Sequence, residues 1–380
     1  MVTLVQKSVS TLVLERATKD AIVETQVYFC ANYSRSLGKM AGTEVTNRAI
    51  TLKHHVDDGK AQESDMELVT TKEKLELRGE NDVIVRVLYL SCDPYLRGRM
   101  RSNRDSYVPP FTPGKPMGGY GIGKVVLSSD PNFKEGDTVS GLMDWADYSH
   151  AFRLTKVDGE TVPVSYYLGA LGMAGFTAYV GFFKICEPKK GETIYVSAAS
   201  GAVGQMVGQF AKLFGCRVVG SAGSQQKVDL LKSKFGYDEA FNYKEESDLD
   251  GALKKYCPGG IDMYFENVGG QMLDAVLLNM KDFGRIAACG MVSQYNKEVQ
   301  DPIHNLGYTI KRRLKLQGFI QSDHLDLQPE FYKNVTGWFK EGKLQYVEDV
   351  ADGIEKAPAA LIGMLEGKNI GKQSVKVSDP

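Results

Sequence analysis

The chain has 380 residues, which is enough for one large domain or two of ordinary size. Apolar residues make up 43% and charged residues 24%, a balance typical of a globular protein with a substantial core. Lysine and arginine (46) nearly balance aspartate and glutamate (47), so nothing points to nucleic acid or an anionic membrane, and we expect a small-molecule or protein partner.

Residues 1–46 differ from the rest of the chain, because their apolar stretches show little sustained periodicity. They lack a positive segment followed by an apolar one, which argues against a secretory signal, and their four acidic side chains argue against a transit peptide. We predict a disordered or dispensable extension and a cytoplasmic protein, with organellar targeting by residues 1–46 left open.

The next stretch predicts a small unit of β-strands. Residues 82–92, 118–129 and 133–153 read as short alternating runs separated by turns. The turn-rich stretch between Arg97 and Gly119 is long for a connection inside a compact domain, so we expect a functional loop over a site.

An uncharged stretch from Thr161 to Phe183 is long enough to span a bilayer. It contains Pro163 and four glycines, however, and a strand followed by a glycine-rich loop comes directly after it. We therefore predict a buried connecting helix between two domains, and no membrane partner.

Strands and helices then alternate from residue 192 to residue 320. This alternation predicts βαβ units and a doubly wound parallel sheet of an α/β fold, because apolar strands without polar alternation fit burial on both faces. The tail adds helices over 328–344 and 354–368, and then a strand over 372–378. The period of two in this last strand suggests that it returns to the β unit.

The segment from Ala198 to Gly204 reads AASGAVG and lies between a predicted strand and a predicted helix. Compared with the G-x-G-x-x-G pattern, Ala199 replaces the first glycine, whereas Gly201 and Gly204 keep the other two. Gly201 would let the backbone approach a pyrophosphate, and Gly204 would allow the helix to pack closely on the strand. The helix N-terminus would supply free N–H groups.

The following strand and turn, residues 218–227, contain no carboxylate where a chain that binds NAD usually has one for the adenosine ribose. An acidic side chain there would repel a 2′-phosphate, whereas Lys227, at the start of the next helix, would attract it. The segment therefore favours NADPH over NADH.

The ligands that a zinc-dependent alcohol dehydrogenase requires are missing from their expected places. Six cysteines are scattered without a CxxC pair, and Tyr120 stands where a zinc-binding histidine would be wanted after Cys92. Without a metal to polarise a carbonyl, a neutral donor such as tyrosine must stabilise a developing oxyanion.

Residues 47–377 resemble the zinc-independent medium-chain reductases. Within that family they are similar to the plant NADPH-dependent 2-alkenal double-bond reductases, which are related to the animal prostaglandin/leukotriene reductases. The matching stretches include LYLSCDPYLRGRM, YVSAASGAVGQ, DMYFENVGG, CGMVSQYN and GKNIGKQ. The resemblance implies a GroES-like β-rich catalytic domain over 47–164 and 345–380, a Rossmann NADPH-binding domain over 165–344, and a homodimer.

The resemblance also assigns the site residues. Tyr295 would be the catalytic hydrogen-bond donor and would contact the substrate together with Tyr95 and Tyr120, while Lys227 and Tyr243 would hold the 2′-phosphate. The full set that it assigns to the cofactor is Pro94, Gly201, Ala202, Val203, Gly204, Gly223, Lys227, Tyr243, Asn267, Cys289, Ser293, Tyr295, Phe319, Ile320, Gln321 and Asn369.

The implied activity is reduction of the C=C bond of an α,β-unsaturated aldehyde or ketone, without a metal. Hydride would go to the β-carbon, Tyr295 would hydrogen-bond the enolate oxygen, and solvent or a tyrosine would protonate the α-carbon. Two alternatives stay open: a zinc-free quinone oxidoreductase, and an NADPH-binding protein without turnover. The sequence does not name the physiological alkene.

Overall fold

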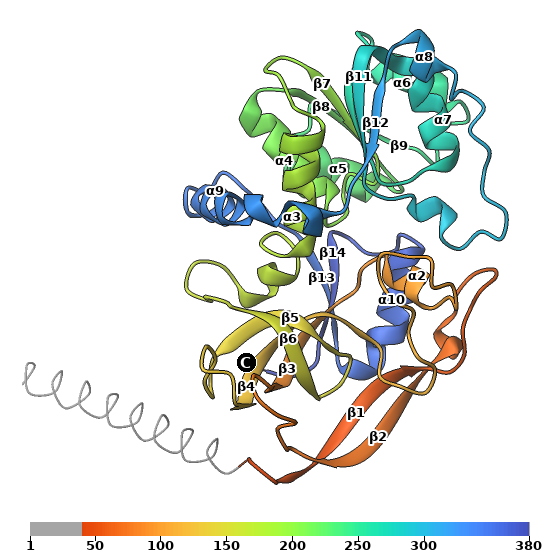
Figure 1. Cartoon of the computed structure of the whole chain (residues 1–380). Coiled ribbons are helices and arrows are strands. Elements are labelled where there is room, and N and C mark those ends of the chain that lie inside the picture. Colours follow the sequence, from red (N-terminus) through yellow and green to blue (C-terminus); the bar gives the residue numbers. More distant parts are fainter. Residues whose placement is uncertain (1–39, 380) are drawn as a thin grey trace, which may run out of the picture.

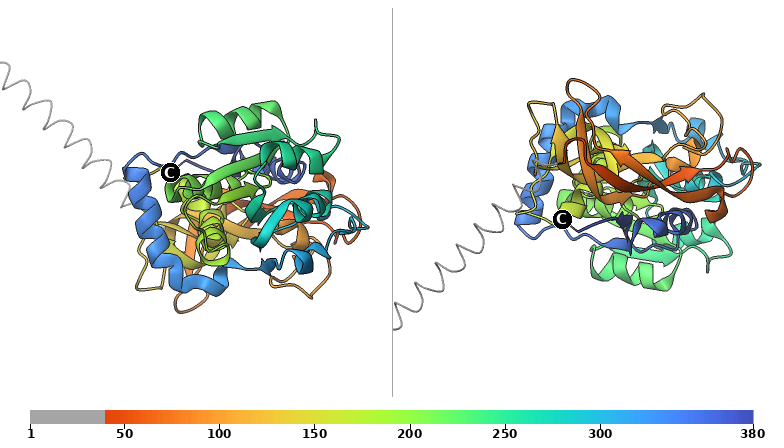
Figure 2. Two further views of the ribbon diagram at one scale, coloured as in Figure 1. Left: turned by 90° about the horizontal axis from the view of Figure 1, so that it is seen from above. Right: turned by 90° about the horizontal axis from the view of Figure 1, so that it is seen from below.

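The computed structural model of the protein describes residues 40–379, so residues 1–39 of the predicted extension lie outside the described residues. The described part forms two domains, which lie one above the other in Figure 1 and are seen from above and below in Figure 2. One is built on a parallel sheet and the other on antiparallel strands.

The upper domain in Figure 1 holds a six-stranded sheet in the order β12-β11-β10-β7-β8-β9. All its neighbouring strands pair in parallel, as predicted for a doubly wound α/β fold. Its strands are β7 (Thr193–Val196), β8 (Arg217–Ala222), β9 (Glu239–Asn242), β10 (Ile261–Glu266), β11 (Met280–Ala288) and β12 (Lys315–Gly318). Its helices are α4 (Gly204–Phe214), α5 (Gln225–Ser233), α6 (Leu249–Tyr256), α7 (Gly270–Asn279) and α8 (Tyr308–Lys311).

Burial explains why these segments form the centre of the sheet. Every residue of β7 is buried, and an apolar strand without polar alternation is what a sheet covered on both faces requires. Helix α4 ends because Gly215 takes a left-handed backbone with φ 87°, which lets the chain turn back into β8. The predicted strand–helix alternation and the predicted end of this helix are confirmed.

The lower domain is β-rich, with strands in the order β13-β14-β3-β4-β5-β6 and a further pairing of β3 with β6. The predicted return of the last strand is confirmed, because β14 pairs with both β3 and β13. The strands are β3 (Val83–Ser91), β4 (Gly118–Ser128), β5 (Thr138–Asp144), β6 (Tyr148–Lys156), β13 (Glu348–Asp352) and β14 (Lys372–Lys376), with helices α2 (Leu96–Arg99) and α10 (Ala357–Leu365).

A hairpin at the start of the described chain was not predicted. Strand β1 (Glu44–Leu52) pairs antiparallel with β2 (Met66–Lys74) along its whole length. It begins inside the segment that the sequence analysis treats as an extension. Its sequence, EVTNRAITL, mixes polar and apolar residues. Several contacts tie it to the body of the domain, among them the hydrogen bond from the Ile50 N–H to the Trp145 carbonyl and the ion pair of Arg48 with Asp147.

The predicted connecting helix over 161–183 is wrong as a single element. The chain forms a 3-10 turn (Val164–Leu168), then α3 (Met173–Tyr179), then a π-helical turn (Val180–Ile185). The break follows from Gly172, where a Cβ would lie only 2.1 Å from the Tyr167 carbonyl oxygen, so the backbone folds back on itself there. Among the described residues, every helix is too short or too polar to cross a bilayer.

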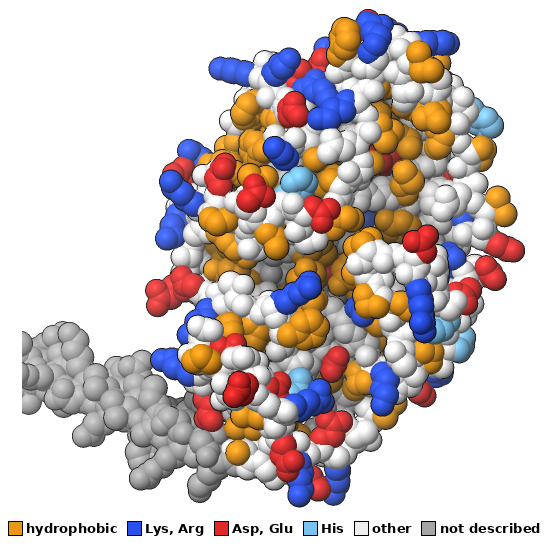
Figure 3. Space-filling model, viewed as in Figure 1, with side chains coloured by type: hydrophobic (Ala, Val, Ile, Leu, Met, Phe, Trp, Pro, Cys, Tyr) orange, Lys and Arg blue, Asp and Glu red, His pale blue; other side chains and the backbone are white. Residues whose placement is uncertain are grey.

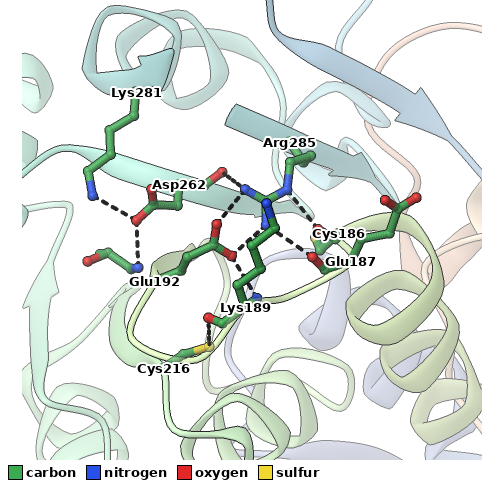
Figure 4. Close-up of polar contacts among 9 residues, drawn as sticks. Cys186, Glu187, Lys189, Glu192, Cys216, Asp262, Lys281 and Arg285 are labelled. Atoms are coloured by element: carbon green, nitrogen blue, oxygen red, sulfur yellow. Dashed lines mark hydrogen bonds and ion pairs between the residues drawn. The ribbon is translucent and has the colours of Figure 1, made fainter. Parts of the chain in front are cut away.

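An ion-pair network lies at the amino ends of the parallel strands, as Figure 4 shows. Arg285 makes a bidentate pair with Glu192, at 2.9 and 2.6 Å, and also donates to the carbonyl of Cys186. Asp262 accepts from Lys281 and from the Thr193 N–H, both at 2.8 Å. These bonds tie β7, β10 and β11 together at the edge opposite the carboxyl ends, which leaves the carboxyl ends free for a ligand.

Side-chain amides of α4 hold the chain segment that leads into β13. Gln205 donates to the Val347 carbonyl at 3.1 Å and accepts from the Val347 N–H at 2.9 Å. Gln209 makes the same pair of bonds with Gln345, at 2.8 and 2.7 Å. Both glutamines are buried, so their side-chain amides satisfy backbone polar groups of this segment inside the protein. Helix α9 (Gln328–Lys340) precedes this segment in the chain.

Candidate active site

The carboxyl ends of the parallel strands face the β-rich domain, and most segments assigned to the cofactor follow those ends. Open α/β sheets bind their ligands in the crevice outside these ends. On the face seen in Figure 3, hydrophobic side chains gather in the band between the two domains, whereas charged side chains are spread over both. The candidate site is this interdomain cleft.

The glycine-rich loop between β7 and α4 brings its backbone close to the cleft. Ala198 takes a left-handed backbone with φ 46°, and its carbonyl accepts from the Gly201 N–H at 3.0 Å. A Cβ on Gly204 would lie 2.6 Å from both the Ala198 carbonyl oxygen and the Ala199 Cα, so only glycine fits there. Ala202 and Val203 complete the turn, and α4 then starts with its free N–H groups at the loop.

A second cluster lies where β8 and β9 end. A Cβ placed on Gly223 would be 3.2 Å from Lys244 Cε and 3.3 Å from Tyr243 Oη, so both side chains lie against this glycine. Sequence reasoning assigned Gly223 and Tyr243 but missed Lys244. The only hint in the sequence is that Lys244 directly follows Tyr243. Its contact with Gly223 depends on the pairing of β9 with β8, which the sequence does not show.

Lys227 points from α5 across the domain boundary. Its ammonium donates to the Gly367 carbonyl at 2.6 Å, and the residue is only 8% exposed. Burial, together with the nearby charge of Lys244, lowers the pKa of Lys227. Two ammonium groups close to each other repel, and a bound dianion relieves that repulsion. Lys227, Lys244 and Tyr243 therefore form a corner suited to a phosphate group.

A buried carboxylate organises the turn after β10. Glu266 accepts from the N–H groups of Val268 and Gly269, at 2.5 and 2.9 Å, and burial raises the pKa of Glu266. The next residue, Asn267, donates from its side chain to the Ser197 carbonyl at 2.8 Å, which ties this turn to the glycine-rich loop. The Ser293 hydroxyl donates to the Val268 carbonyl at 2.6 Å, so Asn267 and Ser293 lie on the same part of the cleft.

The remaining residues assigned to the cofactor come from the C-terminal tail, from the segments after β11 and β12, and from the turn before α2. Asn369 donates to the Gly371 carbonyl at 2.7 Å, and a backbone bridge between Gly371 and Gly201 places this tail segment against the glycine-rich loop. Cys289 follows β11, and burial raises the pKa of its thiol to about 12, so it stays protonated. Phe319 packs against the core ring of Phe265 and contributes shape, while Ile320 follows it and Pro94 lies exposed beside Tyr95.

Tyr295 is held with its hydroxyl proton free. Its oxygen accepts from the Met291 N–H at 3.2 Å, so the hydroxyl hydrogen can be donated to another group. Burial raises the pKa of Tyr295, and the Met291 N–H opposes that effect. The side chain is therefore a neutral hydrogen-bond donor below pH 10, the ordinary pKa of tyrosine.

Tyr95 and Tyr120 come from the β-rich domain and lie near a common point. Burial raises the pKa of each, and the charge of Asp93 adds to the rise in both. The Tyr120 phenol is also hydrogen-bonded by Gln321, a residue assigned to the cofactor, which crosses the cleft from the other domain. Gln321 therefore contacts the substrate side of the cleft.

Tyr107 is a cleft residue that sequence reasoning missed. It lies in the long stretch between α2 and β4, which was predicted to be a functional loop. The residue is 64% exposed, yet burial at its hydroxyl end and the nearby groups of Tyr295 and Cys289 raise its pKa to about 12. Tyr107 is therefore largely at the surface and lies near Tyr295 and Cys289. An irregular loop has no regular spacing of apolar residues, so its sequence does not show which side chains lie near the cleft.

Metal ligands do not come together in the part of the chain that the structure describes, where no group of three or more His, Cys, Asp and Glu side chains is placed to hold an ion. Cys92 is buried, and its surroundings raise the pKa of its thiol to about 12. The donor set of the cleft instead fits a nucleotide that carries an extra phosphate: a glycine-rich loop at the start of α4, a corner with two lysines, and a free phenol donor.

Comparison with known proteins agrees with this reading. Residues 48–157 match the family described as the N-terminal domain of oxidoreductase, and residues 202–341 match the family described as zinc-binding dehydrogenase. The chain is 58% identical over 339 residues to the NADP(+)-dependent 2-alkenal reductase of Nicotiana tabacum, covering 88% of this chain and 98% of that protein. The chain belongs to the zinc-independent medium-chain reductases.

Other members of this medium-chain family are similar over the same length. The (+)-pulegone reductase of Mentha piperita is 48% identical over 340 residues, which cover 88% of this chain and 99% of that protein. The crystal structure of CurA from Vibrio vulnificus in complex with NADPH matches with a TM-score of 0.80 and 37% identity, covering 88% of this chain and 100% of that one. The family that the sequence resembles is thus confirmed.

Proposed function

We propose that this medium-chain reductase uses NADPH to reduce the C=C bond of α,β-unsaturated aldehydes and ketones. The observation that carries the proposal is the geometry of Tyr295, whose phenol proton is free because its oxygen already accepts from the Met291 N–H. The names of relatives at 58% and 48% identity, a 2-alkenal reductase and a pulegone reductase, support the same substrate class.

The nucleotide is held along the cleft by groups from both domains. We assign the pyrophosphate to the loop from Gly201 to Gly204, whose close packing on Ala198 and Ala199 requires glycine at position 204. We assign the 2′-phosphate to Lys227, Tyr243 and Lys244. When bound, NADPH supplies the hydride that adds to the β-carbon of the substrate.

The residues of the chain then handle the charge that develops on the substrate. Addition at the β-carbon moves negative charge to the carbonyl oxygen as an enolate, and the Tyr295 phenol donates a hydrogen bond to that oxygen. Removal of one such donor typically lowers kcat by about 10²- to 10³-fold. Because Tyr295 stays neutral below pH 10, it keeps its donor proton throughout the physiological range. The α-carbon takes its proton from solvent or from a tyrosine of the cleft.

The substrate side of the cleft is aromatic. Tyr95, Tyr120 and Tyr107 present rings and hydroxyl groups from three separate segments, and flat rings favour flat, conjugated substrates. We infer that phenylpropenals and benzylidene ketones fit this surface.

The test is a parallel assay of NADPH oxidation with enals, enones and quinones, followed by mass spectrometry of the products. We expect oxidation with enals and enones and products that are two hydrogens heavier and keep their carbonyl group. Turnover of quinones alone would replace the proposal by a quinone oxidoreductase. Tight NADPH binding without oxidation over the whole panel would leave a nucleotide-binding protein.

We also propose a homodimer, in which the edge strand β12 pairs with its counterpart. An exposed strand edge is a ready template for pairing with another chain. Large apolar side chains are exposed on this edge and on the chain segments next to it: Phe283, Leu306, Ile310 and Leu316. A cytoplasmic location, a plant origin and the domain limits at residues 164, 165, 344 and 345 stay proposals of the same standing. The division of the strands into two separate six-stranded sheets supports these domain limits.

A further inference from the structure

A fully buried arginine lies beside the substrate tyrosine Tyr95. Arg97 is 0% exposed, and its guanidinium donates three hydrogen bonds to three carbonyl oxygens. Two of the acceptors are backbone carbonyls of its own domain, Val56 at 3.0 Å and Gly59 at 2.8 Å. The rigid fork of the guanidinium suits acceptors in fixed directions, which a lysine could not satisfy together.

The third bond of Arg97 crosses the cleft. Its Nε donates to the side-chain oxygen of Asn296 in the Rossmann domain at 2.8 Å, and the Ala61 N–H donates to the same oxygen at 3.4 Å. A neighbouring arginine acts in parallel, since Arg101 donates to the Tyr295 carbonyl at 3.1 Å. Two arginines of the β-rich domain therefore hydrogen-bond two consecutive residues, Tyr295 and Asn296, of the Rossmann domain.

No carboxylate lies within ion-pair distance of Arg97 among the described residues. Burial and the nearby charge of Arg101 lower the pKa of Arg97 to about 10. A buried cation that bonds only neutral oxygens is a costly way to stabilise a fold. Its three acceptors instead fix the relative position of three segments, two from one domain and one from the other.

We propose that the contact between Arg97 and Asn296 is a positioning clasp, which sets the Tyr295 phenol against Tyr95 across the cleft. Arg97 is two residues after Tyr95, and Asn296 directly follows Tyr295. The clasp thus fixes the backbone separation between two side chains that the proposed function places on the substrate, and it rests on that function. Arg97 and Asn296 are positioning residues, because they act through Tyr295 and not on the substrate.

The test is a double-mutant cycle with Asn296→Ala and Tyr295→Phe, with kcat/KM measured on one enone. In the wild-type background, Asn296→Ala should lower kcat/KM by about 10- to 100-fold, because a displacement of about 1 Å is enough for such a loss. In the Tyr295→Phe background the same change should lower it by less than about 2-fold, because the group that the clasp positions is already gone.

Two further variants separate positioning from stability. Asn296→Asp keeps an acceptor oxygen for Arg97 and should retain activity within about 3-fold of wild type. Asn279→Leu is the matched control, because the Asn279 side chain donates only to Asp250 and to the Ala275 carbonyl within the Rossmann domain. It should lower the melting temperature without changing kcat/KM. If Asn296→Ala does not yield folded protein, Arg97→Lys takes its place in the cycle.

The outcomes are distinct. Equal losses from Asn296→Ala in both backgrounds, or no loss in the wild-type background, would overturn the clasp. A rise in the primary isotope effect on kcat with deuterated NADPH in Asn296→Ala supports it, because a misplaced donor slows hydride transfer itself. The proposed function fails separately, by absence of enone reduction in the wild-type enzyme.

Discussion

Among the residues of the phosphate corner, Lys244 was the hardest to predict from the sequence. The missing carboxylate over 218–227 and the position of Lys227 could be read from the chain, because both lie on one strand and one helix start. Lys244 reaches the same corner only because β9 pairs with β8, and that pairing joins segments that sequence reasoning could order but not align. The contact between Arg97 and Asn296 could not be predicted for the same reason, because the two residues are 199 positions apart in the chain.

Removal of a cation from this corner should act on one cofactor only. Lys244→Ala should raise the KM for NADPH by about 10-fold, since a hydrogen bond to a charged group contributes about 1.5 kcal/mol or more. It should leave the KM for NADH within about 2-fold, and Lys227→Ala should act in the same direction more strongly. Steady-state kinetics with both cofactors check this. Lys232→Ala, an exposed lysine of α5 that bonds Glu239, is the control. Equal changes for both cofactors would remove Lys244 from the phosphate site.

The ionisation of Tyr295 predicts the alkaline limb of the pH profile. Its pKa is raised above 10 mainly by burial, so the donor proton is present at all lower pH values and is lost only as pH rises past that raised value. We expect kcat for an enone to show no fall attributable to Tyr295 below pH 10. A profile of kcat against pH in wild type and in Tyr295→Phe checks this. A limb with an apparent pKa near 8 that disappears in Tyr295→Phe would contradict the neutral-donor role.

At the level of elements, alternation of strands and helices was readable, but breaks inside an apolar stretch were not. The stretch 161–183 reads as one helix because it lacks charge, yet Gly172 folds the backbone so that three short segments result. The loop before β4 was predicted to cover a site from its length alone. Tyr107 within it lies near Tyr295 and Cys289 of the other domain, so its position depends on how the two domains meet.

The loop between α2 and β4 should set substrate preference more than rate. Tyr107→Ala removes a ring that lies near Tyr295 and Cys289, so it should raise the KM for an aryl enone by about 5- to 10-fold. The KM for a short aliphatic alkenal should change by less than about 2-fold, because such a substrate has no ring to contact the loop. Steady-state kinetics of Tyr107→Ala with one aryl enone and one aliphatic alkenal check this prediction. A fall of kcat for both would instead mean that the loop serves the chemical step.

For the whole molecule, the fold and family followed from the sequence because buried apolar strands alternate with helices and because dense motifs span the chain. The surface through which two copies of the chain would pair could not be predicted in the same way. Exposed apolar side chains at this edge include Leu316 of β12, at 41%, and Ile310 of the preceding helix α8, at 81%. Strand β12 has four residues, which are too few for its sequence to mark it as an edge.

The edge strand predicts how the oligomer can be broken. Leu316→Arg places a charge in the middle of the proposed interface and should shift the protein from dimer to monomer in analytical ultracentrifugation. Leu77→Arg changes an apolar residue of the β-rich domain that is exposed to a similar extent, 38%, and should leave the dimer intact. A wild-type monomer, or a Leu316→Arg dimer as stable as wild type, would contradict the proposed assembly.

The position of the transferred hydrogen in the product distinguishes C=C reduction from every other reaction of an enone. With NADPH deuterated at the transferable C4 position and an enone such as a benzylidene ketone, we expect a saturated ketone with one deuterium on the β-carbon. Nuclear magnetic resonance of the product locates the label. Deuterium on the carbonyl carbon of an allylic alcohol, or a label-free product, would show that the cleft performs a different reaction.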